Sequence, residues 1–157
     1  MLNLQPESFD CVYTERCVIN ILNLEEQWEA LRQIAKVLKP EGYYLMIEGF
    51  ADGLRNYNKA RSDCGLSEVK QAHHNLNLEK EIFEVDHLFT VVDGSQLGKY
   101  AIAPNFLSSY YFVASVLYPA LAKGEVVRNS EMAKFFSFLP PVGNYSTIQA
   151  YVLQKKR

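Results

Sequence analysis

The fold of this chain is decided by residues 31–48, which read Leu31-Arg-Gln-Ile-Ala-Lys-Val-Leu-Lys-Pro-Glu-Gly42 and then Tyr43-Tyr-Leu-Met-Ile-Glu48. The first part continues a helix whose apolar residues recur at spacings of four and three, namely Leu24, Trp28, Leu31, Ala35 and Leu38. Asn23 is placed to cap this helix and Pro40 to end it. The second part is a near-continuous apolar run, which is typical of an interior parallel strand covered on both faces.

Another strand is expected just ahead of this helix. Phe9 to Thr14 is a β-prone run that follows a Pro-Glu-Ser turn signal. Strand, helix and strand together make one βαβ unit. The sequence therefore predicts an α/β fold.

The remaining elements extend this unit without a linker that would divide the chain into domains. In chain order they are a helix over 53–64 capped by Asp52, a helical piece over 78–85, a strand over 87–92, a mostly helical excursion over about 97–140 and a last strand over 145–153. The excursion carries apolar residues at helical spacing, namely Phe106, Tyr110, Val113, Leu117 and Leu121. We therefore expect one domain over residues 1–157.

Composition excludes several classes of protein. The 157 residues are 48% hydrophobic, which is enough for a globular core, and 16 Lys and Arg against 18 Asp and Glu give a net charge of −2. No basic surface is expected for nucleic acid. The uncharged run between Lys99 and Lys123 is interrupted by prolines, serines and tyrosines, so we expect no membrane span. The spacing of the three cysteines fits neither a disulfide framework nor a zinc motif; they are Cys11, Cys17 and Cys64. The N-terminus also carries no secretory signal, so we expect a cytoplasmic protein.

The quoted residues resemble a known family. Ser8-Phe-Asp-Cys-Val-Tyr13, the helix ending in Leu38-Lys-Pro-Glu-Gly42, and the strand from Tyr43 to Glu48 are similar to a stretch of class I S-adenosylmethionine-dependent methyltransferases. That stretch is usually written S-F-D-x-V, a helix, R-x-L-K-P-G-G, and a strand that ends in an acid. The spacing between the three parts also matches. The chain departs from the pattern at Lys36, where Arg is commoner, and at Glu41, where the family usually has Gly.

The resemblance implies a cofactor but covers only the C-terminal half of the family's domain. Family members hold S-adenosylmethionine with a Gly-rich turn after the first strand and an acid after the second, and this chain has no G-x-G pattern. The resemblance therefore implies a partial Rossmann-like fold: a four-stranded mixed sheet in the order 4-5-7-6 of the family, with a helical insertion before the last strand. We expect a single truncated methyltransferase-like domain.

A truncated sheet would leave one strand without a neighbour. Phe9 to Thr14 would be the edge, and an interior strand lacks the prolines and inward charges that protect natural edges. We expect a homodimer in which two copies of this strand pair antiparallel, or a second polypeptide that supplies the missing strands. The helix around Phe106 to Leu121 is expected to cover the exposed sheet face, either folded back or exchanged between subunits.

Candidate cofactor and substrate residues follow the two parallel strands. Thr14, Glu15 and Arg16 come directly after the first strand, where open α/β folds bind ligands, and the resemblance places this turn beside the cofactor. The alternative is a solvated or ion-paired turn. Glu48 ends the next strand at the same edge, where it can face the cleft as a substrate-binding group or cap a helix.

Other candidates lie further along the chain. His74 could act as a general base near a methyl acceptor, with His73 beside it in the substrate site; the alternative is a surface or capping pair. No metal site is expected there, because adjacent histidines point apart. Tyr110 and Tyr111 could line a substrate pocket, or pack in a core or dimer interface.

Two functions remain open at this point. The chain is expected to be S-adenosylmethionine-dependent methyltransferase-like and inactive alone, because the cofactor-binding half is absent from its sequence. The alternative is a non-enzymatic dimeric protein, derived from a methyltransferase, that binds a small molecule or serves as a scaffold. The methyl acceptor does not follow from the sequence.

Overall fold

The computed structural model describes residues 4–94, 97–98, 101–122 and 130–157. Within these residues, four strands form one mixed sheet: β1 (Phe9–Glu15), β2 (Leu38–Gly49), β3 (Phe89–Val92) and β4 (Ile148–Lys155). Their order is β1-β2-β4-β3, with β1 parallel to β2 and with β4 antiparallel to both of its neighbours. The expected α/β class, the mixed sheet and the arrangement of its four strands are confirmed.

Helix α1 (Leu24–Val37) connects the two parallel strands. The Asn23 side chain caps it by accepting a hydrogen bond of 3.1 Å from the Glu26 backbone N–H. The helix ends at Val37 rather than at Pro40, because the residue before a proline is disfavoured in the helical conformation and the chain turns extended at Leu38. Strand β2 therefore begins five residues earlier than the apolar run that predicted it.

The Lys-Pro-Glu-Gly stretch forms an irregularity in the pairing of β1 with β2. Phe9 pairs with Leu38 and Cys11 with Tyr43, so residues 39–42 bulge out of register. Glu41 adopts a positive φ of 63° in this bulge. Gly42 is required by space, since a Cβ atom there would lie 2.9 Å from the Lys39 carbonyl oxygen.

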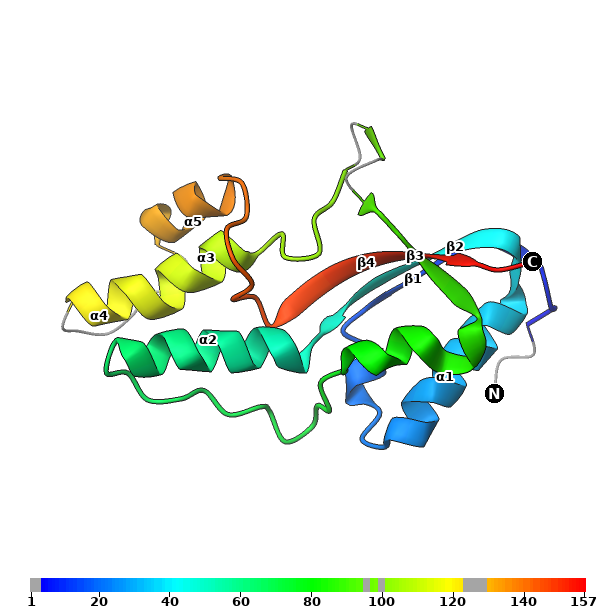
Figure 1. The fold of residues 1–157 in the computed structure, drawn as a ribbon, viewed down its shortest axis with the longest axis horizontal. Coiled ribbons are helices and arrows are strands. Elements are labelled where there is room, and N and C mark those ends of the chain that lie inside the picture. Colours follow the sequence, from blue (N-terminus) through cyan, green and yellow to red (C-terminus); the bar gives the residue numbers. More distant parts are fainter. Residues whose placement is uncertain (1–3, 95–96, 99–100, 123–129) are drawn as a thin grey trace.

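The main core lies on one face of the sheet, between the strands, α1 and a 3-10 segment, η2 (Lys80–His87). Figure 1 shows α1 and η2 on the same side of the sheet. We call this the sheet core; its buried residues are Val18, Ile19, Leu31, Ala35, Leu38, Tyr44, Met46, Phe50, Leu78, Ile82, Val85, Phe89, Tyr151 and Leu153.

The opposite face of the sheet is not covered by the helix expected there. Tyr13 on this face is 71% exposed and Tyr43 is 42% exposed. The stretch around Phe106 to Leu121 instead packs on α2 (Ala51–Asp63), beyond the end of the sheet (Figure 1). It comprises α3 (Ser108–Phe112), a π-helical turn η5 (Val113–Leu117) and α4 (Tyr118–Ala122). The folded-back arrangement is therefore wrong; exchange between subunits stays a prediction.

The helices beyond the sheet form a second, smaller packing unit, the helical lobe, made of α2, α3, η5, α4 and α5 (Glu131–Ser137). Among its described residues the buried apolar ones are Tyr57, Ala60, Val113, Ala114 and Val116. Tyr111 packs edge to face on Tyr57, with ring centroids 6.1 Å apart. The apolar face of the helical excursion is thus satisfied by α2. Within the described part of the chain, no helix is long and apolar enough to cross a membrane.

The segment that contains α2 leaves the sheet and returns to it at neighbouring points. The Ala51 N–H donates to the Leu78 carbonyl at 2.9 Å, and the Leu78 N–H donates to the Gly49 carbonyl at 2.8 Å. Phe50 and Leu78 form a short parallel bridge there. One bridge therefore closes the excursion over residues 51–77.

Candidate functional site

The carboxyl ends of β1 and β2 meet at one edge of the sheet, where open α/β folds bind ligands. Thr14 is half-buried and its hydroxyl lies 2.7 Å from the Tyr44 hydroxyl. Burial raises the pKa of the Tyr44 phenol well above its ordinary value. Glu15 and Arg16 are exposed, and Arg16 turns the chain with a φ of 53°. The structure brings these three residues together, and their role toward a cofactor stays a prediction.

Glu48 is fully buried beneath the turn after β1. Its Oε1 accepts hydrogen bonds from the backbone N–H groups of Cys17 at 3.0 Å and Val18 at 3.2 Å. Its Oε2 accepts a third from Ile19 at 3.3 Å. The carboxylate therefore caps η1 (Val18–Asn20), a short 3-10 turn. Of the two hypotheses for Glu48, the structure therefore agrees with the helix cap. The assignment of Glu48 to a substrate cleft is wrong, because protein atoms surround the carboxylate on every side.

A polar network that the sequence did not predict lies where β2, α2 and β4 meet. Asp52, in the first turn of α2, accepts hydrogen bonds from the Gln149 amide at 2.8 Å and the Asn144 amide at 3.0 Å. The Lys80 ammonium lies 3.5 Å from Asp52 and donates to the Gln149 Oε1 at 2.9 Å. It also donates to the Tyr151 hydroxyl and lies over the Tyr151 ring. The hydrogen bonds and the ion pair of this network therefore join four segments of the chain, namely α2, η2, the residues before β4, and β4.

The electrostatics of this network favour a charged Asp52. Burial raises the pKa of the Asp52 carboxyl, but the Lys80 charge and the hydrogen bonds from Gln149 and Asn144 outweigh it. The pKa of Asp52 is therefore held below its ordinary value of 3.8. The sequence predicted that Asp52 would cap α2, and this prediction is wrong. Phe50 occupies the cap position, and the Asp52 side chain bonds to Gln149 of β4 instead.

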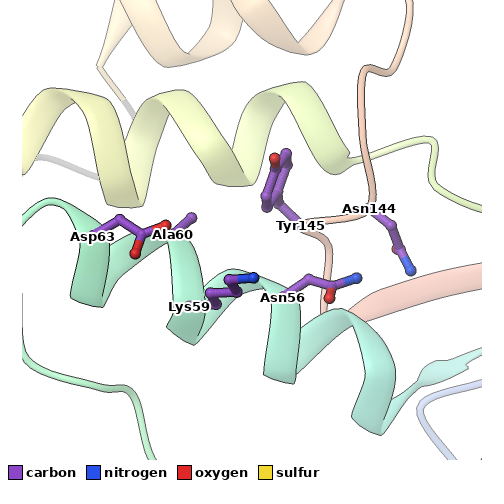
Figure 2. Close-up of a pocket in the computed structure, with 6 residues that line it drawn as sticks. All are labelled: Asn56, Lys59, Ala60, Asp63, Asn144 and Tyr145. Carbon is purple, nitrogen blue, oxygen red and sulfur yellow. The ribbon is translucent and has the colours of Figure 1, made fainter.

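A pocket of about 350 Å³ opens beside this network, between α2 and the segment that leads into β4. Figure 2 shows side chains from one flank of α2 facing two residues of that segment. The lining residues are Asn56, Lys59, Ala60, Asp63, Asn144 and Tyr145. Asn144 belongs both to the network and to the pocket wall, so the two features are continuous.

His73 and His74 lie in an exposed turn of the segment that follows α2. Their rings are perpendicular, with centroids 5.1 Å apart. In Figure 1 this segment runs along the lower side of α2, and α3 lies along the upper side. Among the described residues, no group of three or more His, Cys, Asp and Glu could hold a metal ion. The structure places the histidines in solvent, and their catalytic and substrate roles stay predictions.

Tyr110 and Tyr111 are half-buried in the helical lobe. Tyr111 packs against Tyr57 and its ring centroid lies 5.7 Å from that of Tyr110. Neither tyrosine lines the pocket beside the network. The packing alternative describes Tyr111. The pocket wall is formed by α2 and by the segment before β4, and its residues show no sequence signal beyond the helical spacing of the α2 members.

Comparison with known proteins supports the resemblance drawn from the sequence. Residues 1–46 match the family model described as a methyltransferase domain. The matched stretch covers β1, α1 and the larger part of β2, and the chain is methyltransferase-like over it. No curated protein matches the chain.

Solved structures that are similar to the chain include three of low sequence identity. They are the MccD protein (13% identity, TM-score 0.43), a chain of a complex that contains the Haloferax volcanii Trm112 methyltransferase activator (13%, 0.47), and the YcgJ protein from Bacillus subtilis (12%, 0.45). The alignments cover 99%, 100% and 100% of this chain. The chain spans 64%, 58% and 68% of the respective structures.

Proposed function

We propose that this chain forms one part of an S-adenosylmethionine-dependent methyltransferase unit whose cofactor-holding strands come from other residues. The observation that carries the proposal is the match of residues 1–46 to the methyltransferase domain, which falls on the βαβ unit that builds the ligand-binding edge of the sheet. The cofactor would supply the methyl group. The residues described below would position one side of the site.

The residues present do not form a cofactor cradle by themselves. The 157 residues contain no G-x-G turn. The turn after β1 offers no replacement, because the N–H groups of Cys17, Val18 and Ile19 are all bonded to Glu48. We therefore derive no catalytic step through the cofactor. In the proposed unit Glu48 fixes this turn, Thr14, Glu15 and Arg16 offer side chains to the cofactor, and His74 remains the candidate base.

The free side of β1 is the place for the missing strands in this proposal. Within the described residues β1 pairs only with β2. A groove of about 640 Å³ runs between β1 and α1, with apolar side chains such as Phe9, Val12 and Ile34 along it. Unpaired backbone groups next to an apolar groove favour an added strand with its own apolar face.

Calorimetric titration with S-adenosylmethionine and S-adenosylhomocysteine tests the proposal, with light scattering on the same sample. The purified chain is expected to give no binding heat, and a polypeptide carrying a G-x-G turn and the ribose-binding acid is expected to restore binding when mixed with it. Binding by the chain alone, unaffected by Arg16→Ala and Thr14→Val, would contradict the division of the site.

A second candidate, the dimeric scaffold, rests on the same free strand. β1 is seven residues long and contains neither proline nor lysine, so two copies could pair antiparallel about a two-fold axis. Directly opposed residues in such a pair lie about 4.5–5.5 Å apart, within reach of a disulfide.

Cysteine cross-linking separates the scaffold from the divided enzyme. One variant keeps only Cys11, with Cys17→Ser and Cys64→Ser; a second adds Val12→Cys and Cys11→Ser to those changes. A symmetric pair centred on residue 11 or 12 is expected to give a covalent dimer in one of the two variants on oxidation. A monomer by light scattering, with no cross-linked dimer in either variant, would eliminate this form of the scaffold.

A further inference from the structure

The pocket beside the network is built on one stripe of helix α2. Four residues of α2 line it, at spacings of three, one and three along the chain: Asn56, Lys59, Ala60 and Asp63. This spacing places them on one flank of the helix. Figure 2 shows this flank facing Asn144 and Tyr145. Ala60, which is buried, carries only a methyl group and leaves the hollow open at the middle of the stripe. The volume of about 350 Å³ lies in the range of small-molecule sites.

Two charged side chains in this pocket stand apart from the others on α2. Asp52 is bound to Lys80, Arg55 forms a two-pronged ion pair with Glu79, and Arg61 donates to backbone carbonyls. Among the described residues, the side chains of Lys59 and Asp63 have no hydrogen-bond or ion-pair partner, and they do not pair with each other. The order Lys followed by Asp four residues later is the less favourable one for a direct pair on a helix.

We propose that this pocket binds a small zwitterion, with its carboxylate at Lys59 and its ammonium group at Asp63. Four residues of helix separate the two charges by about 6 Å along the axis, which fits an amino acid whose amine and carboxylate stand at opposite ends of a short chain. The Asn56 amide lies next to Lys59 along the stripe and can donate to the same carboxylate. A plain anion would be repelled by Asp63, and a plain cation by Lys59.

The inference concerns binding and does not depend on methyl transfer. It goes beyond the proposed function, because the pocket lies on α2 and the segment before β4, outside residues 1–46. A chain that binds the zwitterion but never S-adenosylmethionine would support this inference while contradicting the enzyme. The two proposals can therefore fail separately.

Titration of the isotope-labelled chain with 5-aminopentanoate, followed by amide chemical shifts, tests the site. Pentanoate and pentylamine each carry one of the two charges and serve as matched ligands. Lys59 and Asp63 are exposed, and an exposed ion pair contributes up to about 1 kcal/mol. Each of these two ligands is therefore expected to bind about fivefold more weakly than 5-aminopentanoate. Shifts are expected at residues of the stripe and at Asn144.

Charge exchange distinguishes a zwitterion site from a general polar surface. Lys59→Met and Asp63→Asn are each expected to weaken 5-aminopentanoate binding about fivefold. The double variant Lys59→Asp with Asp63→Lys is expected to restore it, because the same ligand can bind end for end. Lys70→Met, at an exposed lysine outside the pocket, is the control and is expected to change nothing.

The proposal is overturned if 5-aminopentanoate gives no shifts at the stripe, or if pentanoate or pentylamine binds as tightly. It is also overturned if the exchanged variant, folded by circular dichroism, binds no better than the single variants. Ala60→Val narrows the pocket without changing its charges, and unchanged binding in that variant would place the ligand elsewhere.

Discussion

The sheet core and the helical lobe are packed in different ways. The sheet core has fourteen buried apolar residues, whereas the described part of the lobe has five, namely Tyr57, Ala60, Val113, Ala114 and Val116. Half-buried aromatic rings and hydrogen bonds to backbone groups hold the remainder of the lobe together, such as those of Ser108 to the segment before β4. Free energies of local opening follow the density of buried apolar contacts. The lobe should therefore open before the sheet, and the pocket should open with it because one wall of the pocket is α2.

Leu31→Ala should have the largest effect, because it removes a fully buried side chain from the sheet core. The free energy of unfolding is expected to fall by about 3 kcal/mol through lost burial and a cavity. Urea denaturation monitored by circular dichroism measures it. Leu24→Ala on the same helix, at a side chain 47% exposed, should change stability by less than about 0.5 kcal/mol. A decrease in the free energy of unfolding of less than about 1 kcal/mol for Leu31→Ala would contradict the placement of Leu31 in the core.

Val116→Ala is the matching change in the helical lobe, at a residue with no exposed surface. Two methyl groups are lost, which predicts about 2 kcal/mol with the cavity included. Hydrogen exchange should accelerate in α2, α3 and α4 and stay unchanged in β2 and β4. Equal acceleration in the sheet would show that the two units unfold as one. Leu117→Ala, at a partly exposed neighbour, is the control.

Asp52→Asn should weaken the junction between the two units by about 1–2 kcal/mol at neutral pH, since hydrogen bonds to a charged group are lost. The pKa of Asp52 is depressed in the folded state, so its contribution is complete above the ordinary value of 3.8 and is lost as the pH falls through the folded pKa. The stability difference between wild type and Asp52→Asn should therefore shrink below about pH 4. A difference constant from pH 7 to pH 2.5, measured by urea denaturation, would contradict the role of the charge.

Glu41→Gly should have the smallest effect, and it should stabilise. Glu41 has a φ of 63°, a conformation that costs an L-residue more than glycine. We expect a gain of about 0.5 kcal/mol after the greater flexibility of glycine in the unfolded chain is counted. Glu41→Ala also removes the ion pair with Arg157 but keeps the strain, and it should not stabilise. Thermal denaturation of both variants measures the difference. Equal melting temperatures for Glu41→Gly and Glu41→Ala would show that the backbone at residue 41 is not strained.

The sequence predicted most of the sheet and little of the site. β1, α1 and β2 carry local signals, a cap at Asn23 and apolar periodicity, and these signals survive without knowledge of the remaining chain. The helical excursion shows its apolar face in the same way, but periodicity does not say which surface that face will meet. It met α2 rather than the sheet.

The polar network of the candidate site could not be predicted from local sequence patterns either. Asp52 and Gln149 are 97 residues apart, and no spacing rule connects them. Glu48 stands out in the sequence as an acid at a strand end, but that position is equally compatible with a cleft and with a helix cap. Only the fold showed that three backbone N–H groups surround it. Long-range polar partners are set by topology, which local patterns do not encode.

The bridge between Phe50 and Leu78 has a consequence for how this chain can be altered. Because the excursion over residues 51–77 starts and ends at adjacent points of the sheet, its length is set by no strand. Doubling such a loop adds only about 0.6 kcal/mol of closure entropy. The stretch between Asp63 and Leu78 is thus a place for insertions: a longer segment could be grafted there while α2, which carries Asp52, Tyr57 and Ala60, keeps its contacts.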